Sequence, residues 1–401
     1  MNQEVFVLDA VRTAVGKYAG ALANIRPDDM AAYVIKHLIE RNKNIPFNET
    51  EEVILGAANQ AGEDNRNVAR MASLMAGLPV SVSGYTVNRL CASGLQAIGN
   101  AFLEIKGNNG DLYISGGTES MTRAPFVMPK SESAYGRNSE IHDTTIGWRF
   151  TNPYLASVYH PYTMGETAEN VAEKWNISRD EQDAFAYNSQ LKWQNANNVN
   201  QFENEIAAYH IAQKKGEPIV FKTDEQPRLS NIETLASLKP AFKKGGSVTA
   251  GNSSSVNDGA AALAIAGTSF IEKNNLTPMV RIVSMAASGV EPAIMGIGPV
   301  EATRKALKRV GLTINDIGLF ELNEAFASQS IACIRELDIN PEIVNVNGGS
   351  IAIGHPLGCS GARISTTLIH EMAKRKTVKY GVATMCIGVG QGLAIVYENL
   401  N

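Results

Sequence analysis

Residues 85–117 read YTVNRLCASGLQAIGNAFLEIKGNNGDLYISGG, and the local pattern changes twice along this stretch. The β-branched and aromatic run at 85–87 predicts a short strand. A helix is predicted from about residue 92 to residue 106, and the apolar run 112–114, which two glycines close, predicts a second strand. A strand, a helix and a strand in succession are typical of a layered α/β domain.

The same alternation continues towards both ends of the chain. Apolar runs of strand length recur at 5–11, 53–55, 279–286, 317–322, 380–386 and 393–398. Helical patterns lie between them and begin near Pro27, Asn67, Asn323 and Pro356. The sequence therefore predicts an α/β fold with two regions of the same type.

The later region repeats the order of features of the earlier one. Residues 360–388 open with Ser-Gly, continue as a predicted helix and end as a strand closed by glycine, as residues 93–117 do. Internal similarity of this kind is expected of a duplicated unit. It predicts that Cys91 and His355 lie at corresponding helix starts, and that Cys386 lies at the end of a strand.

The middle of the chain breaks the alternation. Residues 121–165 have little periodicity and are too long for an ordinary connection. Ser178 and Glu181 form a capping box that predicts a helix running to about residue 196. We expect three parts, namely an N-terminal α/β half over 1–120 plus 250–273, a loop domain over 121–249, and a C-terminal α/β half over 274–401.

Composition excludes several classes of protein. With 401 residues, 44% of them apolar, the chain can bury a large core and is unlike a disordered chain. Its 36 basic and 40 acidic residues give a formal net charge of -4, so no basic field is expected to recruit nucleic acid or an acidic membrane. The 4 cysteines form no CxxC pair, so neither a disulfide framework nor a metal site is expected.

We expect a cytoplasmic protein. The N-terminus enters an apolar run directly, without the basic region and cleavage site of a secretory signal. No apolar run of about 18 residues predicts a membrane span. In a reducing compartment a thiol remains free to react.

Cys91 lies between the predicted strand 85–87 and the predicted helix 92–106. Unpaired N–H groups and the dipole at a helix start favour a thiolate, which is the reactive form of cysteine. Small residues at 92–94 leave room for a substrate. The alternative is a structural cysteine, which is the commoner role of a buried intracellular thiol.

Three further side chains lie in glycine-rich turns or at strand ends. Five glycines surround His355 in residues 345–361, so the backbone can approach a ligand closely, although a lone histidine is more often a satisfied polar residue. Cys386 precedes three glycines whose N–H groups could stabilise an oxyanion, and the alternative is a tight turn with an incidental cysteine. Asn323 is either the N-cap of a helix or an amide that positions a water or polarises a carbonyl.

Taken together, these segments resemble the thiolase family, and the resemblance runs from residue 5 to residue 398. The matching motifs, in order and spacing, are NRLCASG (88–94), GGTESM (116–121), VTAGN (248–252), NEAF (323–326), GHP (354–356) and CIGVGQG (386–392). The resemblance implies a layered α/β/α/β/α fold from two duplicated halves, with an inserted loop domain that binds coenzyme A (CoA).

The resemblance also implies CoA-dependent acyl transfer. Thiolases cleave a 3-ketoacyl-CoA with CoA, releasing acetyl-CoA and a shortened acyl-CoA, or run the reverse Claisen condensation. By resemblance, Cys91 is the nucleophile that carries the acyl group, and Cys386 is the acid and base at the α-carbon. His355 either takes the proton of Cys91 or holds its thiolate as an ion pair. One oxyanion hole uses His355 with a water held by Asn323, and the other uses the N–H groups of Cys91 and Gly388.

Substrate contacts are implied in the same way. The resemblance assigns Arg228 to the adenine, Ser254 to the pantetheine amide, and Met164, Phe242 and Phe326 to the acyl or pantetheine channel. CoA and acyl-CoA are substrates, and neither a tightly bound cofactor nor a metal is implied. The family is dimeric or tetrameric, so a homodimer or homotetramer is expected.

Departures from the family pattern bear on the substrate. Thiolases that make acetoacetyl-CoA often carry His-Met-Gly where this chain has Thr-Met-Gly at 163–165, and residues 62–67 and 143–150 look more like the degradative and 3-oxoadipyl-CoA thiolases. We expect a catabolic enzyme of the fatty-acid β-oxidation type, with a biosynthetic acetoacetyl-CoA thiolase as the close alternative. Ketoacyl-carrier-protein synthases use a second histidine where this chain has Cys386. A non-catalytic lipid carrier or scaffold could dispense with the thiols.

Overall fold

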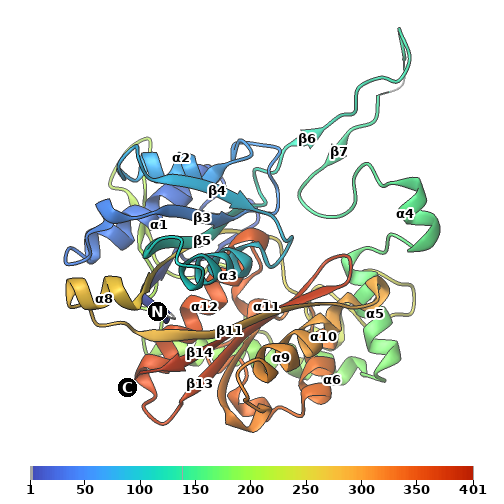
Figure 1. Cartoon of the computed structure of the whole chain (residues 1–401). Helices are drawn as coiled ribbons and strands as arrows, with labels where there is room; N and C mark the ends of the chain where they lie inside the picture. The colour runs from blue at the N-terminus through green and yellow to red at the C-terminus, as the bar shows by residue number, and fades with distance from the viewer. Residues whose placement is uncertain (1–2, 138, 401) are drawn as a thin grey trace.

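Within residues 3–137 and 139–400, which the computed structural model describes, ten strands form one mixed sheet at the centre of the molecule (Figure 1). Residues 1 and 2, which begin the N-terminal stretch in which the sequence predicts no secretory signal, lie outside the described residues. The strand order across the sheet is β12 (Ile317–Leu322), β13 (Tyr380–Ile387), β14 (Gln391–Asn399), β11 (Val280–Gly289), β1 (Val5–Arg12), β10 (Asn257–Gly267), β5 (Leu112–Ser120), β3 (Glu52–Gly56) and β4 (Ser83–Val87), and β2 (Gly16–Lys17) pairs with β10.

The two ends of the sheet have the same topology, which confirms the predicted duplication. In the N-terminal half, β3 runs parallel to β5, while β10 runs antiparallel to both β5 and β1. In the C-terminal half, β12 runs parallel to β13, while β14 runs antiparallel to both β13 and β11. An antiparallel contact between β1 and β11 joins the halves into one sheet.

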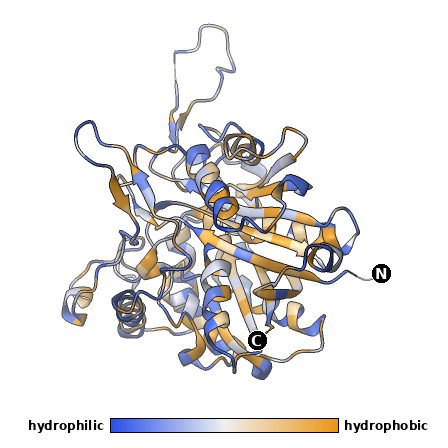
Figure 2. Cartoon of the chain, turned by 90° about the vertical axis from the view of Figure 1, so that its left-hand side faces the viewer, coloured by the Kyte–Doolittle hydropathy of each residue, from blue (hydrophilic) through white to orange (hydrophobic). Residues whose placement is uncertain are grey.

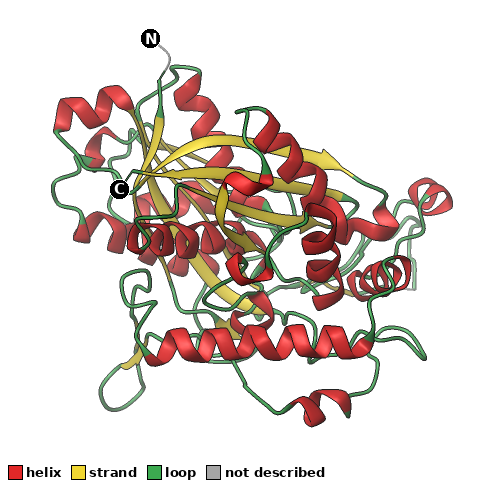
Figure 3. Cartoon of the chain, turned by 90° about the horizontal axis from the view of Figure 1, so that it is seen from below, coloured by secondary structure: helices red, strands yellow, loops and turns green. Residues whose placement is uncertain are grey.

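Helices form three layers around the sheet. The helices α3 (Ser93–Lys106) and α12 (Leu357–Lys374) pack against each other between the two halves, and the largest hydrophobic cluster surrounds them. The outer face of the N-terminal half is covered by α1 (Pro27–Arg41) and α2 (Val68–Met75), and that of the C-terminal half by α9 (Gly298–Lys308) and α10 (Ala327–Leu337). Figure 3 shows helices on both sides of the strands, and Figure 2 shows hydrophobic residues concentrated on the interior strands. The predicted α/β/α/β/α layering is confirmed.

The two central helices touch through their backbones. A Cβ atom on Gly94 of α3 would lie 2.7 Å from the Gly358 carbonyl oxygen, and a Cβ atom on Gly361 of α12 would overlap the backbone of Leu95. Only glycine permits an approach this close. Gly94 and Gly361 belong to the two Ser-Gly pairs that open the repeated units, so the contact is nearly symmetric between the halves.

Residues 121–249 carry the remaining small elements. They are α4 (Pro153–Val158), α5 (Met164–Lys174), α6 (Arg179–Asn198), α7 (Ile232–Ala236) and the hairpins β6 (Phe126–Val127)–β7 (His142–Asp143) and β8 (Tyr209–Ile211)–β9 (Ile219–Phe221). The predicted capping box of Ser178 and Glu181 opens α6. The β6–β7 hairpin projects from the body of the molecule (Figure 1). That this region is a separate domain stays a prediction.

Two further short helices complete the fold, α8 (Thr268–Asn274) and α11 (Ser350–Ile353), with 3-10 turns at 47–49, 292–297, 314–316 and 341–343. In the described part of the chain, no helix is long and apolar enough to cross a membrane. Cys333 and Cys359 lie in hydrophobic clusters, in agreement with a packing role.

One local interpretation of the sequence is wrong. The helix after Asn323 begins only at Ala327, and Phe326 occupies its N-cap position. Asn323 is therefore not an N-cap, and its fully buried amide is directed elsewhere.

Candidate active site

Cys91 lies in the turn between β4 and α3. Leu90, just before it, adopts a left-handed conformation with a φ of 47°. Ser93 holds the turn by accepting a hydrogen bond from the Arg89 N–H (2.9 Å) and donating one to the Leu90 carbonyl (2.6 Å). A left-handed leucine is strained and persists only where its surroundings enforce it. The turn therefore holds the Cys91 side chain in one place ahead of α3.

A cavity of about 190 Å³ opens at Cys91. It is enclosed by the turn before α3, the turn after β13, the start of α5 and the loop segment 144–149. His355, Cys386 and Asn323 do not line this cavity, because their side chains are buried, but their neighbours Leu357 and Gly388 do. Cys91 and Gly388 thus line the cavity directly, whereas His355 and Cys386 each lie two residues along the chain from a residue that lines it.

Burial decides the protonation state of Cys91. It raises the pKa of the thiol to about 11, although the backbone N–H groups of Gly388 and of Cys91 itself face the sulfur and lower the pKa. The predicted effect of the helix start is thus outweighed by desolvation, which disfavours the charged form. If Cys91 is the nucleophile, as the sequence predicts, its thiol therefore needs a base.

His355 is the base that the sequence predicts, and its position is fixed through the backbone. Gly354 before it has a φ of 111°, and the His355 backbone N–H donates to Asn257 Oδ1 (2.9 Å). Burial, followed by the charge of Arg363, lowers the pKa of the imidazole to about 3. The ring is therefore neutral at pH 7 and can accept a proton.

Hydrogen bonds at both ring nitrogens define the His355 tautomer. Nδ1 lies 2.6 Å from Ser360 Oγ, and the Ser360 hydroxyl donates its only hydrogen to the Pro356 carbonyl (2.8 Å). Nδ1 must then be the donor, which leaves the lone pair on Nε2. At the other side, Asn323 Nδ2, a donor, faces Nε2 at 3.5 Å. Both contacts assign the basic nitrogen to Nε2.

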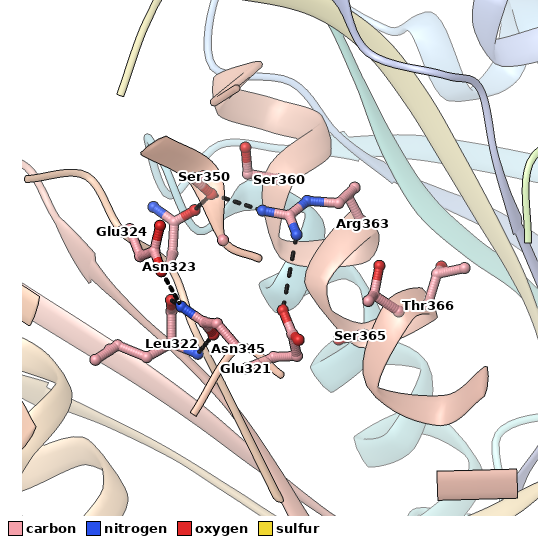
Figure 4. A network of polar contacts seen from close by, with 12 residues as sticks. Glu321, Leu322, Asn323, Glu324, Asn345, Ser350, Ser360, Arg363, Ser365 and Thr366 are labelled. Carbon is pink, nitrogen blue, oxygen red and sulfur yellow. Dashed lines mark hydrogen bonds and ion pairs between the residues drawn. The ribbon is translucent and has the colours of Figure 1, made fainter. Parts of the chain in front are cut away.

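A buried chain of hydrogen bonds orients Asn323 (Figure 4). Ser350 Oγ donates to Asn323 Oδ1 (2.6 Å) and accepts from Arg363 Nη2 (2.6 Å). Arg363 Nη1 also lies 3.7 Å from Glu321 Oε2, and burial raises the pKa of that carboxyl to about 8. Because Arg363 has only donors, Ser350 accepts from Arg363 and donates to Asn323 Oδ1, which leaves Asn323 Nδ2 facing His355.

Cys386 and Gly388 lie at the end of β13, beside the nucleophile. Cys386 packs with Met164 and Phe326 in a small hydrophobic cluster, and burial together with the nearby Cys91 raises the pKa of its thiol well above the usual value. Val389 follows Gly388 in a left-handed conformation (φ 64°), which turns the chain back into β14. The structure brings the two predicted thiols and the predicted N–H donor together.

The five predicted CoA contacts form a path from the cavity to the surface. Met164 lines the cavity, and Phe326 lies in its cluster. The Phe242 ring meets that of Phe326 edge to face, with centroids 6.1 Å apart, and is 41% exposed. Ser254 Oγ donates to the Ala325 carbonyl (3.0 Å), and the exposed Arg228 contacts the Ala250 carbonyl (3.4 Å). The path has an apolar inner end and a polar outer end, which suits pantetheine and adenine.

The sequence motifs did not single out the supporting residues Asn257, Ser350, Ser360 and Arg363. Ser350 and Ser360 lie within the glycine-rich stretch 345–361 around His355, so their hydroxyl groups could have been considered as hydrogen-bond partners. Arg363 lies on a helix whose pattern predicts a buried packing element, and no neighbouring residue indicates that it belongs to a site.

Glu119, in the motif 116–121, was also missed. Its carboxylate lines the cavity and accepts hydrogen bonds from the N–H groups of Ala58 (2.9 Å), Asn59 (3.1 Å) and Gly358 (2.8 Å). Burial raises its pKa to about 7. It clamps the N-terminal half to the start of α12.

The duplicated fold and the thiol at the start of a central helix identify an acyltransferase. The family model described as "Thiolase, N-terminal domain" matches residues 5–269, and "Thiolase, C-terminal domain" matches residues 276–399. The chain belongs to the thiolase family, whose members act on CoA thioesters. The family, fold class and enzyme class predicted from the sequence are confirmed.

Similar proteins cover the whole chain. Beta-ketoadipyl-CoA thiolase of Pseudomonas putida is 52% identical over 400 residues, which are 99% of this chain and 100% of that protein. The 3-oxoadipyl-CoA/3-oxo-5,6-dehydrosuberyl-CoA thiolase of Escherichia coli (strain K12) is 51% identical over 401 residues, again 99% and 100%. The crystal structure of human mitochondrial 3-ketoacyl-CoA thiolase in complex with CoA has a TM-score of 0.92 and 39% identity, and covers 100% of this chain and 98% of that chain.

Proposed function

We propose that this thiolase cleaves 3-oxoadipyl-CoA with CoA, giving acetyl-CoA and succinyl-CoA, through an acyl-Cys91 intermediate. The names of the P. putida and E. coli relatives support this substrate. They point away from the fatty-acid β-oxidation and acetoacetyl-CoA substrates that we expected from the sequence.

The observation that carries the proposal is the single cavity at Cys91, whose volume of about 190 Å³ suits a short acyl group. For scale, an apolar cavity of about 150 Å³ in another protein accommodates benzene, a molecule of six carbons. A six-carbon acyl group is therefore of the right size.

The first step needs a proton acceptor for the Cys91 thiol, and the neutral His355 ring has a free lone pair. The Cys91 thiol gives its proton to His355 Nε2, and the sulfur attacks the keto carbon of the substrate. The oxyanion that forms lies where the N–H groups of Cys91 and Gly388 already face the sulfur. Protonation turns His355 Nε2 from an acceptor into a donor.

The new donor serves the second step. When the C2–C3 bond breaks, the electrons pass to the acetyl-CoA fragment as an enolate, whose oxygen needs a donor. Protonated His355 and a water held by Asn323 supply it, and Cys386 protonates the α-carbon. The thiol of CoA then attacks the acyl carbon and gives its proton to the Cys386 sulfur. His355 returns its proton to the departing Cys91 sulfur, which leaves the free enzyme.

The loop domain holds the CoA substrates, with Arg228 and Ser254 at the polar end and Met164, Phe242 and Phe326 along the channel. The protein acts without a tightly bound cofactor or a metal, and in the cytoplasm, where its thiols remain reduced. We further propose a homodimer or homotetramer. The exposed apolar side chains Phe126, Met128, Tyr135 and Ile141 on the projecting hairpin support this proposal. Sedimentation at several concentrations tests it, and a monomer throughout would refute it.

Steady-state kinetics test the substrate. We expect the highest kcat/KM with 3-oxoadipyl-CoA, in comparison with acetoacetyl-CoA, 3-oxohexanoyl-CoA and 3-oxopalmitoyl-CoA. Cys91→Ala should abolish thiolysis, whereas Cys333→Ala, which removes a thiol from the core, should retain it. A preference for acetoacetyl-CoA or for the long chain would refute the substrate, and an active Cys91→Ala would refute the mechanism.

A further inference from the structure

One wall of the cavity at Cys91 is the loop segment 144–149, all of which lines it. Thr144 Oγ1 donates to the Pro125 carbonyl (2.6 Å) and accepts from Asn59 Nδ2 (2.9 Å). Trp148 Nε1 donates to the Tyr162 carbonyl (3.0 Å). The segment is thus tethered near both ends, which fixes the position of its last residue, Arg149, relative to the nucleophile.

Arg149 is the cation of this cavity. Among the described residues that line the cavity, Lys and His are absent, Arg149 is the only basic side chain and Glu119 is the only acidic one. Glu119 is occupied by three backbone N–H groups. Within residues 3–137 and 139–400, the Arg149 guanidinium has no hydrogen bond and no ion pair.

An unpaired guanidinium beside a nucleophile favours an anionic substrate. Arg149 is half-buried, so pairing with a carboxylate would be only partly screened by water. The planar guanidinium matches a carboxylate through two parallel hydrogen bonds. The terminal methyl group of a neutral acyl chain at the same place would displace water from the guanidinium without forming a hydrogen bond or an ion pair with it.

We propose that Arg149 binds the terminal carboxylate of a dicarboxylic 3-oxoacyl group and thereby selects it over the neutral acyl group of equal length. This inference rests on the proposed function. It adds the group that recognises the far end of the acyl chain, while Cys91 acts at the keto carbon. Cys91 and Arg149 both line the same cavity.

The phosphates of CoA are also anions and could instead be what Arg149 binds. A matched pair of substrates distinguishes a contact with phosphate from a contact with the acyl carboxylate. 3-Oxoadipyl-CoA and 3-oxohexanoyl-CoA have six acyl carbons each and the same CoA, and they differ in the terminal carboxylate. A contact with phosphate affects both substrates equally. A contact with the acyl carboxylate affects only the first.

The test measures kcat/KM for both substrates in the wild type, Arg149→Gln, Arg149→Lys and Arg137→Gln. Arg137 is an exposed residue of the β6–β7 hairpin, which precedes this segment, and it does not line the cavity, so its variant controls for the loss of one positive charge. For Arg149→Gln we expect a loss of about 30- to 100-fold with 3-oxoadipyl-CoA and less than about threefold with 3-oxohexanoyl-CoA. Arg149→Lys should lie between, since it keeps the charge but not the paired hydrogen bonds.

The outcomes separate this inference from the proposed function. A wild type that does not prefer 3-oxoadipyl-CoA refutes the proposed function. A wild type that prefers it, with the preference unchanged in Arg149→Gln, refutes the role of Arg149 alone. Equal losses with both substrates would assign Arg149 to a CoA phosphate and would also overturn the inference.

Discussion

Replacement of Ser350 by alanine tests the buried chain that orients Asn323. The hydroxyl of Ser350 is the only link between Asn323 Oδ1 and Arg363 Nη2, at 2.6 Å to each. Without it, the amide of Asn323 is free to turn and can present its oxygen to His355 Nε2. The ring would then favour a hydrogen on Nε2 and lose the lone pair that accepts the proton of Cys91.

The magnitude follows from what the hydroxyl contributes. All three side chains are fully buried, so its loss leaves an acceptor and a charged donor unsatisfied, which should lower the free energy of unfolding by about 2–4 kcal/mol. One hydrogen bond that fixes the amide contributes about 1.4 kcal/mol, which corresponds to a tenfold change in rate. We therefore expect kcat to fall about tenfold and KM for CoA to change less than about twofold.

A double-mutant cycle separates this role from a general loss of stability. If Ser350 acts through Asn323, then Ser350→Ala should not lower kcat further in an Asn323→Ala background. Thr366→Val is the matched control, since it removes another buried hydroxyl of the same region, which donates to the Ala362 carbonyl (2.9 Å). Additive losses in the cycle, or a tenfold loss of kcat in the control, would refute the reasoning.

Other consequences of the site can be tested directly. Cys386→Ser should keep the acylation of Cys91 by acetyl-CoA but slow the exchange of the acetyl hydrogens with deuterium at least about a hundredfold, since a hydroxyl is a weaker acid; unchanged exchange would contradict its role. The free energy of unfolding should fall as the pH rises from about 5 to 8, because burial raises the pKa of Glu321 from 4.5 to about 8, and the folded state then retains a proton that the unfolded state has lost. Denaturant titrations of Glu321→Gln should show a flatter dependence on pH, and an identical slope would assign the effect to other groups. Gly165→Ala should raise KM for CoA about three- to tenfold with kcat retained, because its Cβ would overlap the Phe242 ring, and an unchanged KM would remove Phe242 from the CoA path.

Local sequence patterns predicted the elements of the fold well, because their causes are local. The capping box at Ser178, the proline at the start of α1 and the β-branched runs of the strands act over a few residues. The repeated order of features also placed Cys91 and His355 ahead of α3 and α12 before any contact was known. What local patterns did not predict is the joining of the halves through β1 and β11, which depends on pairing between distant segments.

The same distinction between local and long-range causes applies to the residues of the site. Motif spacing singled out Cys91, His355, Asn323 and Cys386, but the hydrogen-bond partners of Asn323 come from positions 27 and 32 residues away, and no local rule reports them. The protonation state of Cys91 was misjudged for a similar reason. The helix start is visible in the sequence, whereas the depth of burial that outweighs it is a property of the whole fold.

The contact between Gly94 and Gly361 bears on how such a protein could have changed after its halves were duplicated. At these glycines the backbones of α3 and α12 are in contact, with no side chain between them. A single added methyl group would act as a wedge between the two copies, and no repacking of flexible groups could absorb it. Any later substitution at Gly94 or Gly361 would therefore have to move the two helix starts apart, which would separate the segments that carry Cys91 and His355.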